Sequence, residues 1–133
     1  MRLYFETSIL IDYIESKGAK SKVVLDLIMR ALRCEFEIVI SDFTILEAIK
    51  KEQPSKFEMM FEVIKAKNKL VMVLKNAEDF EKAKRLEKQY GIHWHDILHC
   101  LLAKKAGADY VVTRDRHFWA LRGLLQPNLP EDF

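Results

Sequence analysis

Residues 93–115, HWHDILHCLLAKKAGADYVVTRD, contain an apolar helical run, a glycine and a β-branched run that leads to an acid. The apolar run predicts a helix from Asp96 to Ala106, and Gly107 is a typical residue at which a helix ends. Tyr110 to Thr113 is predicted to be a buried strand, and Asp115 follows it closely. A helix that leads into a buried strand is typical of a crossover connection between parallel strands.

The same alternation of strand and helix runs through the rest of the chain. Further strands are predicted at Leu3 to Phe5, Phe36 to Ile40 and Leu70 to Leu74. Apolar residues at helical spacing predict helices over Thr7 to Glu15, Val23 to Leu32, Ser41-Asp42 to near Pro54, Ser55 to Lys67, Asn76 (as a cap) to Tyr90, and His117 to Leu121. Strands separated by helices imply an α/β protein with a mostly parallel sheet covered on both faces.

The composition is that of a soluble globular protein, with 50% hydrophobic and 32% charged residues in 133. We expect one domain over residues 1–133, because no linker or repeat divides the chain. No apolar run is long enough for a membrane helix, and MRLYFETSIL lacks the features of a secretory signal. Cys34 and Cys100 suit a reducing cytoplasm, although a disulfide between them stays open at this stage.

The net charge of +2 is too small to indicate a nucleic-acid-binding protein. Basic residues nevertheless gather in the second half of the chain, at Lys82, Lys84, Arg85, Lys88, Lys104, Lys105, Arg114, Arg116 and Arg122. They are either solvated helix faces or contacts for a phosphate backbone. On the second interpretation we expect Arg114, Arg116, Lys104 and Lys105 to contact the phosphate backbone of a nucleic acid.

Two acids follow predicted strands directly. Glu6 interrupts the apolar residues on either side of it, and a carboxylate in that setting needs a partner, a cation or a raised pKa. A capping role is open to Glu6, but Thr7 and Ser8 are better helix caps. Asp115 follows the strand that ends at Thr113, and it is also a natural cap for the helix at His117.

Two more acids lie on predicted helices. Glu47 falls about 40° from Phe43 on a helical wheel, at the edge of the apolar stripe, and it is otherwise an ordinary solvated glutamate. Asp96 lies at the start of its helix, where the alternative role is an N-cap. Parallel topology brings all of these junctions to one rim of the sheet. Four carboxylates crowded there favour hard cations such as Mg²⁺ or Mn²⁺, and two such ions are able to clamp a phosphodiester.

Four stretches carry a resemblance to a known family: YFETSILIDY, ISDFTILEAI, HDILHCLLAKKAGADYVVTRDRHF and LLQPNLPEDF. In this order and spacing they resemble the PIN-domain family (PilT N-terminus), particularly the VapC-type toxin ribonucleases. The most specific feature is the acid before an apolar helix, followed by a strand that ends in Thr-x-Asp. The resemblance implies a three-layer α/β/α sandwich with a central parallel sheet of four or five strands.

The resemblance also implies a cytoplasmic Mg²⁺- or Mn²⁺-dependent ribonuclease, with RNA as substrate. Its catalytic, metal-binding acids would be Glu6, Glu47, Asp96 and Asp115, and Ser8 and Thr113 would support them. It further implies a homodimer and a cognate antitoxin protein whose tail docks near the active site. The sequence departs from the family at Glu6, where aspartate is usual. An extra methylene moves the carboxylate by about 1 Å, a displacement that can cost roughly 10²-fold in rate.

Other interpretations remain open at this stage. His95-Asp96-Ile97-Leu98-His99 has the outline of the H-E-x-x-H zinc motif, but aspartate replaces the glutamate and no third ligand is evident. His-Asp also occurs in HD-type phosphohydrolases, which are all-helical, and a haloacid-dehalogenase-type phosphatase would need a nucleophilic aspartate at Glu6. The main alternative to a nuclease is a catalytically weakened PIN-like module that binds RNA or protein.

Overall fold

The computed structural model describes residues 1–15, 18–51 and 55–133. Its five strands are β1 (Arg2–Phe5), β2 (Glu37–Ser41), β3 (Leu70–Val73), β4 (Tyr110–Val112) and β5 (Pro127–Asn128). The α-helices are α1 (Thr7–Glu15), α2 (Ala19–Leu32), α3 (Asp42–Lys51), α4 (Ser55–Ala66), α5 (Ala77–Tyr90) and α6 (Trp94–Lys105). Two 3-10 helices, η1 (Arg116–Leu121) and η2 (Pro130–Asp132), complete the described part of the chain.

The strands form one parallel sheet in the order β3-β2-β1-β4-β5. The predicted parallel sheet and the four predicted strands are therefore confirmed, with end points that shift by one residue. The fifth strand is only two residues long, which is too short to produce a hydrophobic pattern. The expected helix end near Pro54 lies outside the described residues. The two cysteines are free thiols.

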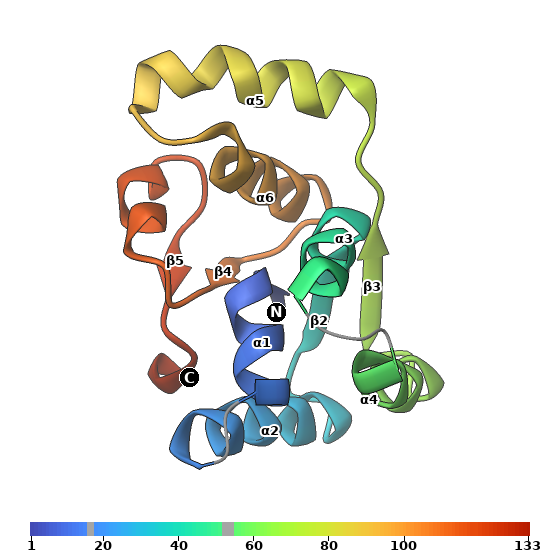
Figure 1. The fold of residues 1–133 in the computed structure, drawn as a ribbon. Helices are drawn as coiled ribbons and strands as arrows, with labels where there is room; N and C mark the ends of the chain where they lie inside the picture. The colour runs from blue at the N-terminus through green and yellow to red at the C-terminus, as the bar shows by residue number, and fades with distance from the viewer. Residues whose placement is uncertain (16–17, 52–54) are drawn as a thin grey trace.

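Helices cover both faces of the sheet (Figure 1). Because side chains alternate along a strand, Leu3 and Phe5 enter one apolar cluster while Tyr4 enters the other. The first cluster packs under α1, α2 and α4, and the second packs under α5, α6 and η1. None of the described helices combines the length and the apolar character needed to cross a membrane.

The strand order brings the ends of β1 and β4 together at one edge of the sheet. The chain runs from β1 outward to β2 and β3, and then returns to the other side of β1 to form β4 and β5. The direction of winding therefore reverses between β1 and β4. In open parallel sheets such a reversal opens a crevice at the carboxyl ends of the strands. Phe5 pairs in register with Val112, so the residues that follow these two strands are neighbours in space.

Helix ends follow the predicted signals at α5 and depart from them at α6. Asn76 caps α5 through its side chain, which accepts from the Asp79 N–H at 2.9 Å, and Gly91 ends the helix at φ +65°. Helix α6 begins at Trp94 and not at Asp96, because the His93 ring accepts a hydrogen bond from the His95 N–H at 3.3 Å. Asp96 is therefore free of the capping role that its position suggested.

We expect replacement of Asn76 by alanine to lower the free energy of unfolding by about 1 kcal/mol. Alanine removes the side-chain oxygen that accepts from the Asp79 N–H, while it keeps the backbone N–H of residue 76 that donates to the Asp79 side chain. Chemical denaturation measures the effect. The control is Asn76→Ser, which keeps a capping oxygen and should retain most of the stability. Equal destabilisation by both substitutions would contradict the capping role.

Candidate functional site

Glu6 follows β1 directly, next to the end of β4, and only 8% of its surface is exposed. Its backbone N–H extends the pairing of the two strands by donating to the Val112 carbonyl at 3.1 Å. The Glu6 side chain, and not Thr7 or Ser8, holds the first turn of α1, since its Oε2 accepts from the Ser8 N–H at 3.2 Å. The expectation that Thr7 and Ser8 would be the better caps was wrong, because both hydroxyls are bonded to glutamates instead.

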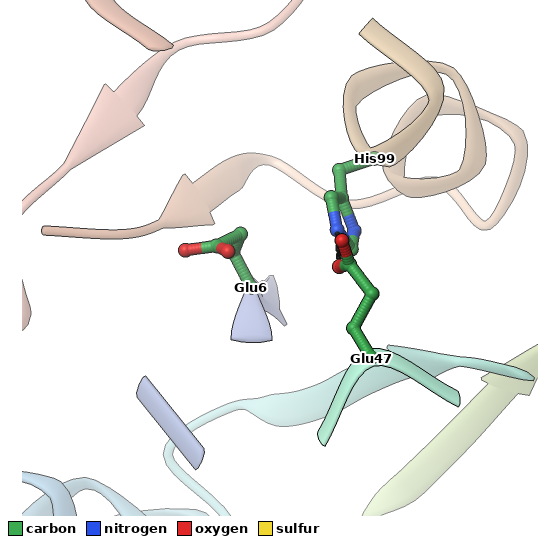
Figure 2. A group of neighbouring side chains, drawn as sticks. All are labelled: Glu6, Glu47 and His99. Carbon is green, nitrogen blue, oxygen red and sulfur yellow. Dashed lines mark hydrogen bonds and ion pairs between the residues drawn. The ribbon is translucent and has the colours of Figure 1, made fainter. Parts of the chain in front are cut away.

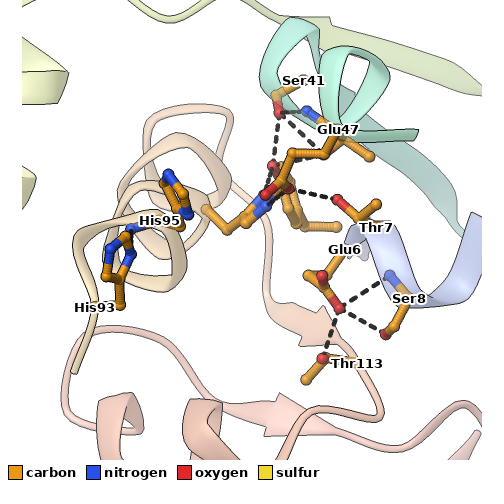
Figure 3. Close-up of polar contacts among 11 residues, drawn as sticks. Glu6, Thr7, Ser8, Ser41, Glu47, His93, His95 and Thr113 are labelled. Carbon is orange, nitrogen blue, oxygen red and sulfur yellow. Dashed lines mark hydrogen bonds and ion pairs between the residues drawn. The ribbon is translucent and has the colours of Figure 1, made fainter. Parts of the chain in front are cut away.

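The carboxylate of Glu6 is held by one oxygen only. Oε2 accepts from the Ser8 hydroxyl at 2.6 Å and from the Thr113 hydroxyl at 2.8 Å, as Figure 3 shows. The other oxygen, Oε1, makes no hydrogen bond to any residue that the structure describes. Ser8 and Thr113, the two hydroxyl residues predicted to support the site, are therefore both in contact with Glu6. One oxygen of Glu6 stays available for a further ligand.

Glu47 is positioned in a similar way from α3. Its Oε1 accepts from the Thr7 hydroxyl at 2.7 Å and from the His99 Nε2 at 2.5 Å. Burial by itself would raise the pKa of Glu47, but the bonds from His99 and Thr7 outweigh burial and hold this pKa below its ordinary value. Glu47 is thus a carboxylate directed inward beside Glu6 (Figure 2), and not a solvated glutamate on the helix surface.

A buried polar chain extends from Glu47 into the core. The Nδ1 of His99 lies 2.7 Å from the hydroxyl of Tyr4, which is in turn 2.7 Å from the Ser41 hydroxyl and 3.0 Å from the Thr44 hydroxyl. Tyr4, Ser41, Thr44 and His99 are all essentially inaccessible to solvent. Burial raises the pKa of Tyr4 well above its ordinary value, so the phenol stays protonated. This chain fixes the orientation of His99 and, through it, of Glu47.

The contacts of His99 disfavour the zinc interpretation of His95 and His99. Both ring nitrogens of His99 are engaged, by Tyr4 and by Glu47. The His95 ring instead lies against the rings of Trp94 and Phe43. Among the described residues, neither group able to hold a metal ion includes His95.

Asp96 and Asp115 form a second acidic group with His117. One candidate ligand atom from each of the three lies within 4.8 Å of the others. The Nδ1 of His117 is 3.3 Å from Asp115 Oδ1 and 4.0 Å from Asp96 Oδ2. Asp115 also caps η1 by accepting from the His117 N–H at 3.0 Å. The capping alternative is therefore correct for Asp115, and it coexists with a position beside Asp96.

The electrostatic environment of Asp96 is unusual. Burial, reinforced by the charges of Asp115 and Glu6, raises the pKa of Asp96 to about 6. The ordinary value for this residue is 3.8. A carboxyl group with such a pKa loses its proton readily near neutral pH when a cation binds beside it.

Thr113 connects the two acidic groups. Its hydroxyl donates to Glu6 and accepts from the Asp115 N–H at 3.0 Å. The four predicted acids therefore meet at one edge of the sheet, as two adjoining groups: Glu6 and Glu47 with His99, and Asp96 and Asp115 with His117. These four acids make up the acidic edge of the sheet. Whether these acids bind metal and act in catalysis remains a prediction.

The predicted RNA-binding residues lie in different places. Arg114 is paired with Asp12 and Glu131, and Arg116 is exposed at the start of η1. Lys104 and Lys105 lie in the last turn of α6, at the opposite end of the helix from Asp96. The Nζ of Lys105 contacts the Leu74 carbonyl and Asp79. Arg114 and Arg116, but not these two lysines, flank the acidic edge.

Comparisons with known proteins agree with this architecture. The PIN domain family model matches residues 3–124. A search of curated protein sequences gave no match. One similar solved structure is VapBC2 from Rickettsia felis bound to a DNA fragment from its promoter, with a TM-score of 0.69 and 16% identity over 97% of this chain and 98% of that chain. Another is PAE2754 from Pyrobaculum aerophilum, with a TM-score of 0.58 and 13% identity over 95% of this chain and 83% of that one. At these identities the likeness concerns the fold.

We expect Asp96→Asn to stabilise the metal-free protein at pH 7.5 by on the order of 1–2 kcal/mol, since each pKa unit corresponds to about 1.4 kcal/mol. The pKa of Asp96 is higher in the folded than in the unfolded chain. The favourable contribution of this carboxyl group is therefore full below about pH 4 and is lost as the pH rises through about 6. Denaturation in EDTA across this range should show the advantage of the variant shrinking toward pH 4. A pH-independent difference would contradict the raised pKa.

Tyr4→Phe should lower the free energy of unfolding by about 1–3 kcal/mol, because it leaves buried polar groups without a partner. The matched control is Tyr110→Phe, whose hydroxyl bonds to no described residue and whose ring packs on Phe133. That control should change stability by less than about 0.5 kcal/mol. Equal effects of the two substitutions in urea denaturation would show that the Tyr4 hydroxyl is not a structural link.

Proposed function

Because the chain belongs to the PIN domain family, we propose that it is a divalent-metal-dependent endoribonuclease and the toxin of a VapBC-type toxin–antitoxin pair. PIN domains are generally nucleases. The observation that carries the proposal is the arrangement of the two glutamates at the carboxyl edge of the sheet. Each has one oxygen fixed by hydrogen bonds and one oxygen that bonds to none of the described residues.

The donor set fits Mg²⁺ or Mn²⁺. Both ions prefer carboxylate oxygens, and each of the two acidic groups supplies a pair of carboxylates. Glu6, Glu47, Asp96 and Asp115 would hold the metal. When bound, a divalent ion supplies a Lewis acid that activates water and offsets the charge that develops on a phosphate during hydrolysis.

The residues of the chain contribute orientation and charge. The Ser8 and Thr113 hydroxyls hold Glu6 in place, while His99 and Thr7 hold Glu47. Asp96 and Asp115 concentrate negative charge, and burial together with this charge raises the pKa of Asp96. Carboxylates held at fixed positions need little reorganisation when a cation and a phosphate arrive, and such preorganisation is a large part of electrostatic catalysis.

The longer side chain of Glu6 has its own supports. Three hydrogen bonds to Oε2 place its carboxylate, so the extra methylene does not leave the group loose. We propose that Glu6 keeps the role that aspartate usually has in the family. The alternative, a weakened module that binds RNA or protein without cleaving it, is an outcome that the experiment below separates.

The partners of the protein are also proposals. The VapBC2 structure from Rickettsia felis contains a DNA fragment from its promoter. This likeness supports a cognate antitoxin, which we propose as the partner of the chain. From the family resemblance we also propose a homodimeric toxin and a cytoplasmic location. A small DNA-binding protein encoded immediately upstream would support the antitoxin.

Purified protein should cleave single-stranded RNA when Mn²⁺ or Mg²⁺ is added and should not cleave it in EDTA. Asp96→Asn should reduce the rate at least about 100-fold, because it removes a charged ligand from the acidic edge. The matched control is Asp26→Asn on α2, which makes the same chemical change away from that edge and should leave the rate unchanged. RNA binding without cleavage under either metal would overturn the nuclease proposal in favour of the binding module.

A further inference from the structure

The short helix η1 has three distinct faces. A 3-10 helix has three residues per turn, so side chains at i and i+3 lie one above the other. Phe118 and Leu121 are fully buried and pack in the core. His117 faces the carboxylates of Asp115 and Asp96. The third face carries Arg116 and Trp119, and it opens on a cleft beside the acidic edge.

The cleft joins distant parts of the chain. It has a volume of about 640 Å³ and is lined by Lys20, Arg114, Arg116, Trp119 and Leu129. That volume falls in the range of sites that take small organic ligands. Trp119 is partly exposed and Leu129 is 37% exposed, so the cleft contains apolar surface as well as cations.

The three cations of the cleft differ in whether they form an ion pair with an acid. Arg114 is paired with Asp12 and Glu131, and its charge is therefore balanced within the protein. The side chains of Lys20 and Arg116 make no hydrogen bond or ion pair with any residue in the described ranges. These two cations, of which Lys20 is within electrostatic reach of Glu131, lie beside an aromatic ring. This combination matches a ligand that has a flat ring and negative charge.

We propose that this cleft is a nucleobase-binding subsite for single-stranded RNA, in which a base stacks on Trp119 and the adjoining phosphates contact Arg116 and Lys20. This inference rests on the proposed nuclease function, since it places a nucleotide next to the acids. Arg116 and Trp119 adjoin Asp115 and His117 along one short helix, so a strand that reaches Asp115 passes the cleft. Bases paired in a duplex are already stacked on one another and cannot lie on Trp119, so the subsite selects unpaired RNA.

The fluorescence of Trp119 gives a direct test. The chain has two tryptophans, so Trp94→Phe leaves Trp119 as the sole reporter. In EDTA, which prevents cleavage, a short single-stranded RNA should quench this emission and saturate it, whereas a duplex of the same sequence should not. Trp119→Ala should weaken binding of the same RNA, measured by anisotropy, about tenfold, and Trp119→Phe should retain most of the affinity.

Two surface variants keep the test valid if Trp119→Ala fails to fold. Arg116→Ala and Lys20→Ala should each weaken binding and reduce its dependence on salt concentration. The matched control is Lys65→Ala, an exposed lysine on α4, which should bind like the parent protein. Equal effects of the Lys65, Lys20 and Arg116 substitutions would overturn the subsite.

Cleavage assays separate this inference from the proposed function. If the parent cleaves RNA and Trp119→Ala does so with an unchanged KM, the subsite is wrong while the nuclease proposal stands. If the parent binds RNA with quenching but cleaves none under Mn²⁺, the subsite stands and the nuclease proposal fails. Quenching by an acidic peptide but not by RNA would overturn the subsite and indicate a protein-binding cleft.

Discussion

The structure depends on holding several carboxylates close together at the carboxyl edge of a parallel sheet, where their charges repel one another. Hydrogen bonds offset part of this repulsion. Hydroxyls and an imidazole bond to a single oxygen of Glu6 and a single oxygen of Glu47. The remaining repulsion is visible in the raised pKa of Asp96, which burial causes first and the neighbouring acids reinforce. An edge of this kind favours a cation, because a cation lowers the cost of ionising all four acids together.

The supports of the two glutamates differ in kind. Glu6 accepts hydrogen bonds from Ser8, which lies in the first turn after β1, and from Thr113, which follows β4. Residues at the ends of two neighbouring strands therefore position it. Glu47 comes from a helix, and its position depends on His99 and on the buried Tyr4 behind it. The second apolar cluster thereby affects the functional edge, since Tyr4 and His99 pack among its side chains. Core packing and acid geometry are coupled in this half of the molecule.

The helix η1 connects the apolar core, the acids at the edge of the sheet and the cleft. Its buried residues anchor it in the core, His117 adjoins the acids, and Arg116 and Trp119 line the cleft. In the proposed subsite, η1 would therefore place a bound nucleotide beside the acids. The lysines at the far end of α6 have no such relation to the acids, because the length of the helix separates them.

The sequence by itself determined the parallel sheet and four of its five strands, because apolar periodicity is a local property of the chain. It also predicted that four acids lie at one edge of the sheet, and their role in catalysis stays a prediction. It also identified Asn76 and Gly91, whose effects arise within one helix turn. The tertiary structure alone decided that the acids form two groups, that His99 binds Glu47, and that Tyr4 and Thr7 take part. These contacts join residues 40 to 95 positions apart, and their distances depend on how the layers pack, which no local pattern records.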